Sequence, residues 1–188
     1  MGSTLEYDES TQTIKMNYNN VASYSVNLTD NEAKDILKQI IPKAVKFYGV
    51  FNGTGSFKLD KTKTIPGEPN YAQVIDEKIT SIEDLKKWVE ETFTKDVAQT
   101  VFFSRYLTPG IGSLPLYKDY EGKLYNDTGN GGHGWAFDYL TDTAKVISQK
   151  DNVAVVELDR TLFNNPDIKL TLRIEYINDK WKLASRLD

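Results

Sequence analysis

Helical and strand-like patterns occupy different parts of this chain, and that order limits the folds open to it. Helical spacing of apolar residues is found before residue 110, whereas alternation dominates after residue 112, as in Leu170, Leu172, Ile174 and Tyr176. Strands that follow one another without intervening helices pair as antiparallel neighbours. The sequence therefore predicts an α+β fold, in which N-terminal helices pack on a curved antiparallel β-sheet.

The clearest helix is predicted to begin at Thr29 or Asp30, residue types that cap helices. Its apolar residues recur at helical spacing on one face: Ala33, Ile36, Leu37, Ile40, Ile41, Ala44, Val45 and Tyr48. Pro42 lies within this pattern and removes one backbone donor, so we expect a kink or a break beside it. Gly49 is predicted to end the helix.

Two further helices and a series of strands are expected after this helix. Thr80 and Glu83 form a capping-box pattern ahead of a helix with Ile82, Leu85, Val89 and Phe93 on one face, and Thr94 begins another that ends before Pro109. Short strands are predicted around Phe57 and at 71–75. A hairpin with Glu121-Gly122 at its turn joins strands 116–120 and 123–125. Four more strands are predicted at 144–149, 153–162, 169–177 and 181–186.

The chain of 188 residues is expected to form one folded domain. We predict a polar N-terminal segment, 1–28, that is partly loose, followed by a single α+β domain at 29–188. Its helical part is about 29–110 and its sheet part about 111–188. The start Met1-Gly2-Ser3 indicates that an export signal has been removed.

The amino-acid composition excludes several classes of functional site. The chain has no cysteine and one histidine, His133, which excludes disulfides, thiolate metal sites, a cysteine nucleophile and any two-histidine site within one chain. With 23 basic and 27 acidic residues the net charge is −4, which argues against nucleic-acid binding. No apolar run reaches 18 residues, so we expect no membrane span. We predict no cofactor and no metal.

Chemically interesting residues concentrate between 113 and 142. His133 lies among glycines, but Ser113 lacks the second glycine of a nucleophile elbow, so a catalytic triad is not favoured. The loop 126–134 fails as a calcium site because Phe137 stands where the bidentate glutamate belongs. The acidic residues here are Asp119, Glu121, Asp127, Asp138 and Asp142. They are compatible with a solvated face, a surface that steers a basic partner, or a hydrolase carboxylate pair.

Several short segments, taken in order, resemble a known family. They are residues 79–89, 92–98 with its Phe93-Thr94 pair, 120–125 with Gly122-Lys123-Leu124-Tyr125, and a glycine-rich loop that ends at Trp135. The chain over about 30–186 resembles the secreted bacterial inhibitors of cell-wall DL-endopeptidases, the cell-separation inhibitor family. It departs from the family pattern in carrying His133 in the loop, where small polar residues are expected.

The resemblance implies a protein without catalysis that acts outside the membrane as a monomer. Its partner would be a cell-wall cysteine endopeptidase that cuts peptidoglycan stem peptides after D-glutamate, and an acidic surface with a mobile loop would cover the peptidase cleft. The matching partner-binding residues are Asp119, Glu121, Asp127, Asn130, Gly131, Gly132, His133, Trp135 and Asp138.

A second hypothesis is a small-ligand-binding domain of the cystatin-like cone type, in which helices close a sheet over an apolar pocket. A deep apolar pocket would favour this ligand binder. A filled core with an exposed acidic loop would favour the inhibitor.

Overall fold

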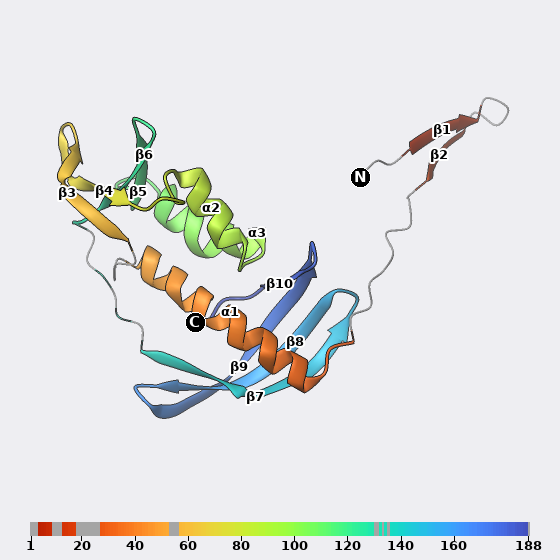
Figure 1. Cartoon of the computed structure of the whole chain (residues 1–188). Helices are drawn as coiled ribbons and strands as arrows, with labels where there is room; N and C mark the ends of the chain where they lie inside the picture. The colour runs from red at the N-terminus through yellow and green to blue at the C-terminus, as the bar shows by residue number, and fades with distance from the viewer. Residues whose placement is uncertain are drawn as a thin grey trace.

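The computed structural model describes residues 4–8, 13–17, 27–52, 57–129, 132, 134 and 136–187, and its side chains from residue 27 onward. It confirms the α+β class. Figure 1 shows the long helix α1 running from one four-stranded sheet, β7–β10, toward a second one, β3–β6, which lies beside the shorter helices. The sequence predicted a single curved sheet, so the second sheet is a difference in architecture within the same class.

Helix α1 spans Asp30–Phe51 and begins as predicted. Thr29 is its N-cap, and the capping box is reciprocal because the Thr29 backbone N–H donates to the Glu32 carboxylate at 2.8 Å. Of the kink or break expected at Pro42, the break is wrong, since the helix continues through it. Pro42 is on the exposed face, where water can solvate the carbonyl that its missing N–H leaves unpaired. The end predicted at Gly49 is also wrong, because Val50 and Phe51 are buried and extend the helix.

Helix α2 spans Ile82–Glu90, and its N-cap is one residue later than predicted. Ser81, not Thr80, is the N-cap, and its hydroxyl accepts from the Asp84 backbone N–H at 3.1 Å. The third helix begins after Thr94 as α3, Lys95–Val97, and continues as the π-helix η1, Ala98–Leu107. Pro109 and Gly110 follow the end of this helix, as expected.

The β3–β6 sheet has the strand order β3-β4-β6-β5 and is antiparallel throughout. Its strands are β3 Lys58–Ile65, β4 Glu68–Ile75, β5 Tyr117–Tyr120 and β6 Lys123–Asp127. Strands β3 and β4 form a hairpin between α1 and α2. Strand β6, which follows α2, α3 and η1 in the sequence, pairs with β4 and completes the sheet.

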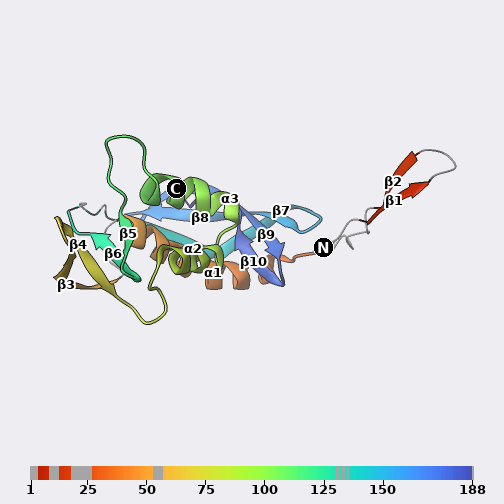
Figure 2. The same ribbon diagram turned by 90° about the horizontal axis from the view of Figure 1, so that it is seen from above.

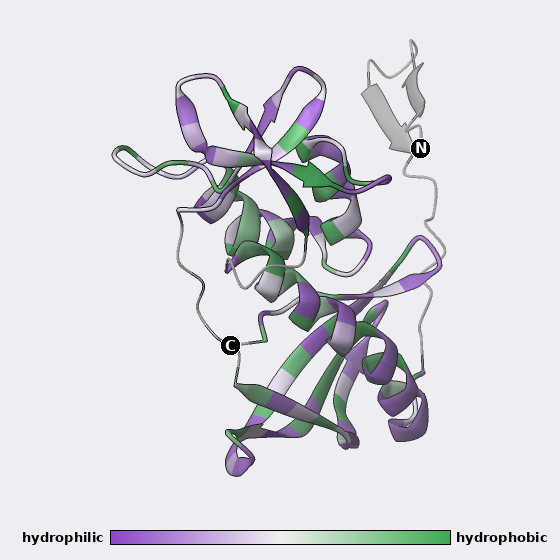
Figure 3. Ribbon diagram, turned by 60° about the vertical axis from the view of Figure 1, so that its left-hand side comes forward, coloured by the Kyte–Doolittle hydropathy of each residue, from purple (hydrophilic) through white to green (hydrophobic). Residues whose placement is uncertain are grey.

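The β7–β10 sheet has the strand order β10-β9-β8-β7 and is the meander that the alternation predicted. Its strands are β7 Phe137–Lys150, β8 Val153–Leu162, β9 Asn165–Ile177 and β10 Lys180–Leu183. Strand β8 matches the predicted bounds, whereas β7 starts seven residues earlier than predicted. Figure 3 shows apolar and polar residues alternating along these strands, as one-sided burial requires.

A further two-stranded pairing, β1 Thr4–Asp8 with β2 Thr13–Asn17, lies within the segment that was expected to be partly loose. Among the described helices, none is long and apolar enough to cross a membrane.

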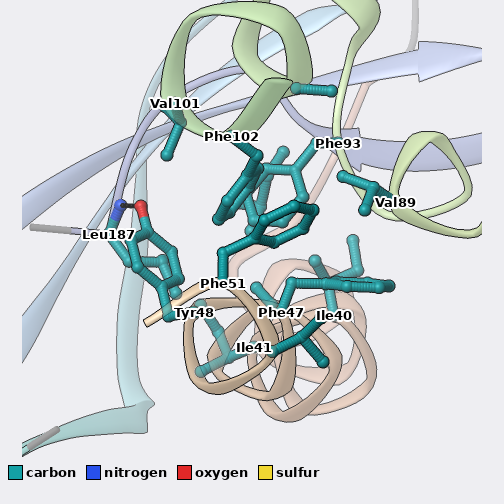
Figure 4. Close-up of a cluster of buried hydrophobic side chains, with 14 of the residues drawn as sticks. Ile40, Ile41, Phe47, Tyr48, Phe51, Val89, Phe93, Val101, Phe102 and Leu187 are labelled. Carbon is teal, nitrogen blue, oxygen red and sulfur yellow. Dashed lines mark hydrogen bonds between the residues drawn. The ribbon is translucent and has the colours of Figure 1, made fainter. Parts of the chain in front are cut away.

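Aromatic side chains fill the space between α1 and the shorter helices (Figure 4). Phe102 lies at the centre, with its ring centroid 5.2 Å from that of Tyr48, 4.9 Å from Phe51 and 5.1 Å from Phe93. Figure 2 shows the β3–β6 sheet at one end of α1 and the β7–β10 sheet along it. The two sheets therefore share one continuous core through α1.

Candidate partner-binding site

The β5–β6 hairpin presents the first two predicted partner-binding residues. Glu121 and Gly122 form its turn with φ of 47° and 70°, and positive φ at both central residues is the geometry of a type I′ turn. Gly122 adopts this conformation without a Cβ penalty. Glu121 is exposed at the tip of the hairpin, and its carboxylate raises the pKa of the Tyr120 hydroxyl through a hydrogen bond.

Asp119 is exposed on β5, but its carboxylate has a structural partner. One carboxylate oxygen, Oδ1, accepts a hydrogen bond from the Ile82 backbone N–H at 2.8 Å, at the first residue of α2. A carboxylate is favourable there because the N-terminus of a helix carries partial positive charge and unpaired N–H groups. This hydrogen bond joins the hairpin to α2, so one of the two carboxylate oxygens of Asp119 already has a partner within the protein.

Asp127 ends β6 and starts the connection between the two sheets. Its Oδ1 accepts from the Gly129 backbone N–H at 2.9 Å, the local pattern of an Asx turn. The next residue, Thr128, donates from both its N–H and its hydroxyl to the carbonyl of Asn70, at 2.8 and 2.9 Å. These bonds hold the start of the connection against β4.

Strand β7 presents two acidic residues with different surroundings. Asp138 is exposed opposite Thr161 of β8 and makes no ion pair with any described residue. Asp142 pairs with Lys38 of α1 at 2.6 Å, and hydrogen bonding and charge from that lysine lower the pKa of Asp142. Asp138 is therefore the member of this pair that is available to a partner.

The structure distributes the predicted acidic residues over several places. Strand β6 separates the tip at Glu121 from Asp127 by roughly 14 Å at 3.4 Å per residue, and Asp138 belongs to the other sheet. Asp127 and Asp138 instead mark the two ends of the connection between the sheets. Within that connection Gly132 and Gly134 are exposed, whereas Asn130, Gly131, His133 and Trp135 lie outside the described residues.

Sequence reasoning missed a second feature, a groove of about 550 Å³ formed by α1, the end of α2 and the β9–β10 turn. Its lining combines aromatic rings with amines, including Phe47, Trp88, Trp181, Lys43 and Lys180. These residues come from three segments that are far apart in sequence, so no spacing pattern could have indicated the groove. In the described part of the chain, no three His, Cys, Asp or Glu side chains gather as a metal-binding group.

Comparisons with models of known protein families and with curated proteins find no match to this chain. The assignment of function consequently depends on the residues themselves and on the resemblance described above.

Proposed function

We propose that this protein is an extracellular, non-catalytic inhibitor of cell-wall DL-endopeptidases. The observation that carries the proposal is the position of Asp127 and Asp138 at the two ends of the glycine-rich connection between the sheets. Neither carboxylate makes an ion pair with a described residue, so both are available to a basic partner. The resemblance to the cell-separation inhibitor family supplies the class of partner, a cysteine endopeptidase.

Inhibition in this proposal is a matter of access to the peptidase cleft. Asp127 and Asp138 increase the rate of encounter with a basic cleft, and the connection between them covers it. Exposed charges act over about 8–10 Å at physiological salt, so their contribution to the association rate falls as salt is added.

The filled interface between α1 and the β7–β10 sheet favours this proposal over the cystatin-like alternative. Leu37, Ile41 and Ala44 on α1 are buried in the same cluster as Val156 and Leu172 of the sheet. Side chains therefore occupy the position where a cone-shaped domain would enclose its apolar ligand.

The test is inhibition of peptidoglycan cleavage by purified DL-endopeptidases, combined with association kinetics at several salt concentrations. The double variant Asp127→Asn/Asp138→Asn is expected to associate about tenfold more slowly at low salt, with little change in dissociation rate. Asparagine keeps the acceptor that Gly129 uses, so the Asx turn is preserved.

Asp142→Asn is the matched control for the single variant Asp138→Asn, because each removes one charge from β7 and Asp142 is already paired with Lys38. It should leave association nearly unchanged. Absence of a complex with several such peptidases at micromolar concentration in low salt would remove the inhibitor proposal. Equal slowing by Asp142→Asn and Asp138→Asn would show that net charge, and not the position of the carboxylate, is responsible.

A further inference from the structure

Two tryptophan side chains, Trp88 and Trp181, line the groove between α1, the end of α2 and the β9–β10 turn. Trp88 is half-buried and packs edge-on against Phe47, with ring centroids 4.5 Å apart. Trp181, on β10, is also half-buried and packs on Tyr176 at 5.3 Å. Each indole therefore keeps an accessible part that faces the groove, while its remaining surface is fixed by neighbouring rings.

Thr92 gives the groove a buried polar group without a partner. The residue is 4% exposed and lines the groove. Its backbone is satisfied, because its N–H donates to the Val89 carbonyl at 3.0 Å and its carbonyl accepts from the Leu183 N–H at 2.8 Å. Its hydroxyl makes no hydrogen bond with any described residue. Buried hydroxyls are nearly always hydrogen-bonded, and because Thr92 lines the groove, a molecule bound there is a candidate partner for this hydroxyl.

The charges around the groove favour an anion. Lys43, Lys46 and Lys180 line it, opposed by the carboxylates of Glu91 and Asp179, in a protein whose net charge is −4. None of the three lysines makes an ion pair with a described residue, and the Lys46 amine lies over the Trp88 ring at 4.8 Å from its centroid. The groove is thus locally cationic on an acidic protein.

We infer that this groove binds a small organic anion that carries a planar apolar group. The planar group stacks on the two indoles, its carboxylate is held by the lysine amines, and a polar atom of the ligand accepts from or donates to the Thr92 hydroxyl. A volume of about 550 Å³ is in the range of small-molecule sites, which span roughly 300–1,000 Å³. The inference is independent of the inhibitor proposal, since it concerns different residues and a different class of ligand.

The probe is 1-naphthoate, compared with the uncharged 1-naphthalenemethanol, on the full chain. Binding is measured by calorimetry and by chemical-shift changes of assigned amides and indole N–H groups. Naphthoate is expected to shift Thr92, Lys43, Trp88 and Trp181 in a saturable way and to bind more tightly than the alcohol. The double variant Lys43→Gln/Lys180→Gln should weaken naphthoate binding about tenfold and leave binding of the alcohol unchanged.

Two variants control for charge and for folding. Lys61→Gln/Lys145→Gln removes the same charge from exposed positions outside the groove and should bind naphthoate like the wild type. Thr92→Val keeps the shape and both backbone bonds but removes the hydroxyl, so it should bind several-fold more weakly. Its melting temperature without ligand should equal or exceed that of the wild type, because an unpaired buried hydroxyl is lost.

The inference fails if naphthoate does not bind, if the shifts lie outside the groove, or if the alcohol binds equally well. It also fails if either groove variant binds naphthoate as tightly as the wild type. A fall in the melting temperature of Thr92→Val would show that the hydroxyl has a structural partner, and would overturn the role assigned to it.

Discussion

The two four-stranded sheets are attached to α1 by different kinds of contact. The β7–β10 sheet uses rows of aliphatic side chains, with Ala154, Val156 and Leu158 on β8 and Leu170, Leu172 and Ile174 on β9 all buried. The β3–β6 sheet buries Val74 and Leu124 in the same core and adds a buried tyrosine, Tyr117. The Tyr117 hydroxyl donates to the carbonyl of Val50 in α1 at 2.8 Å. Tyr71 belongs to a separate cluster, and its hydroxyl donates to the Pro115 carbonyl, outside α1, at 2.5 Å.

The two kinds of contact have different effects: aliphatic burial stabilises the packing of a sheet on α1, whereas a buried hydroxyl also fixes how the strand is oriented. Aliphatic burial stabilises in proportion to area and has no preferred direction. A buried tyrosine adds a hydroxyl that must find its acceptor, so it fixes where the strand lies relative to the helix. Burial raises the pKa of Tyr117, which keeps this hydroxyl protonated as a donor. We therefore expect the β7–β10 sheet to set global stability and the β3–β6 sheet to open first.

Phe102 is the residue whose loss should affect both regions at once. It is 1% exposed and its ring contacts three aromatic neighbours from α1 and the segment after α2. Phe102→Ala should reduce the free energy of unfolding by about 3–5 kcal/mol through lost burial and the cavity left behind. Chemical denaturation monitored by fluorescence and by far-UV circular dichroism would measure this. Two separated transitions in the variant would show that the regions are held together mainly by this ring.

Leu37→Ala tests the aliphatic attachment alone. Leu37 is fully buried on the α1 face that packs against the β7–β10 sheet, so its truncation should cost about 2–5 kcal/mol. The loss should appear in the global transition, with amide exchange accelerated in β8 and β9 as much as elsewhere. Ile36→Ala is the control, because Ile36 is only partly buried and should cost less. A melting shift of zero for Leu37→Ala would contradict the assignment of this face to the core.

Tyr117→Phe tests orientation with almost no change in apolar area. Removing the hydroxyl leaves the Val50 carbonyl without its donor, at a cost of about 1–2 kcal/mol. Amide exchange should accelerate in β5 and β6 more than in β8 and β9. Tyr176→Phe, on β9 outside the buried set, is a matched control with a smaller expected effect. Uniform acceleration across both sheets would show that β3–β6 does not open independently.

The same contrast explains what could be predicted from the sequence. Alternation in 153–162 and the helical stripe from Ala33 to Tyr48 report one-sided burial directly, and the bounds of β8 and the start of α1 were predicted correctly. The pairing of β4 with β6 joins residues such as Tyr71 and Asp127 that are far apart along the chain. No local pattern encodes that pairing, so the second sheet was merged with the first in the prediction.

For the candidate sites too, local patterns could be predicted and contacts between distant segments could not. Residues close in sequence, such as Asp119 and Glu121, were expected to act together and do share a hairpin. The roles of individual carboxylates depended on contacts that sequence does not show: Asp119 binds the start of α2, and Asp142 pairs with Lys38. The groove could not be predicted because Lys43, Thr92 and Trp181 meet only after folding.

The smallest expected effects on stability come from changes at the N-terminal caps of α1 and α2. Hydrogen bonds from the Ser81 and Thr80 hydroxyls and the Thr80 N–H lower the pKa of Asp84, and those from Thr29 lower the pKa of Glu32. A carboxyl whose pKa is lower in the folded protein stabilises it above the unfolded pKa of about 4, and this contribution is lost as pH falls through the folded value. Asp84→Asn and Glu32→Gln should therefore be less stable than the wild type at pH 7, with differences that shrink below about pH 4.

The two cap variants should differ in where the loss appears. Helix α2 is short and joined to β5 by Asp119, so Asp84→Asn should accelerate amide exchange locally in α2 and β5. Helix α1 is buried from its first turn to its last, against the β7–β10 sheet and the aromatic side chains of the shorter helices, so Glu32→Gln should accelerate exchange only in its first turn. Melting curves from pH 2.5 to 7, with exchange measured at pH 7, would test both statements. A pH-independent difference would contradict the lowered pKa values. If Glu32→Gln destabilised all of α1, burial along its length would not be what holds that helix in place.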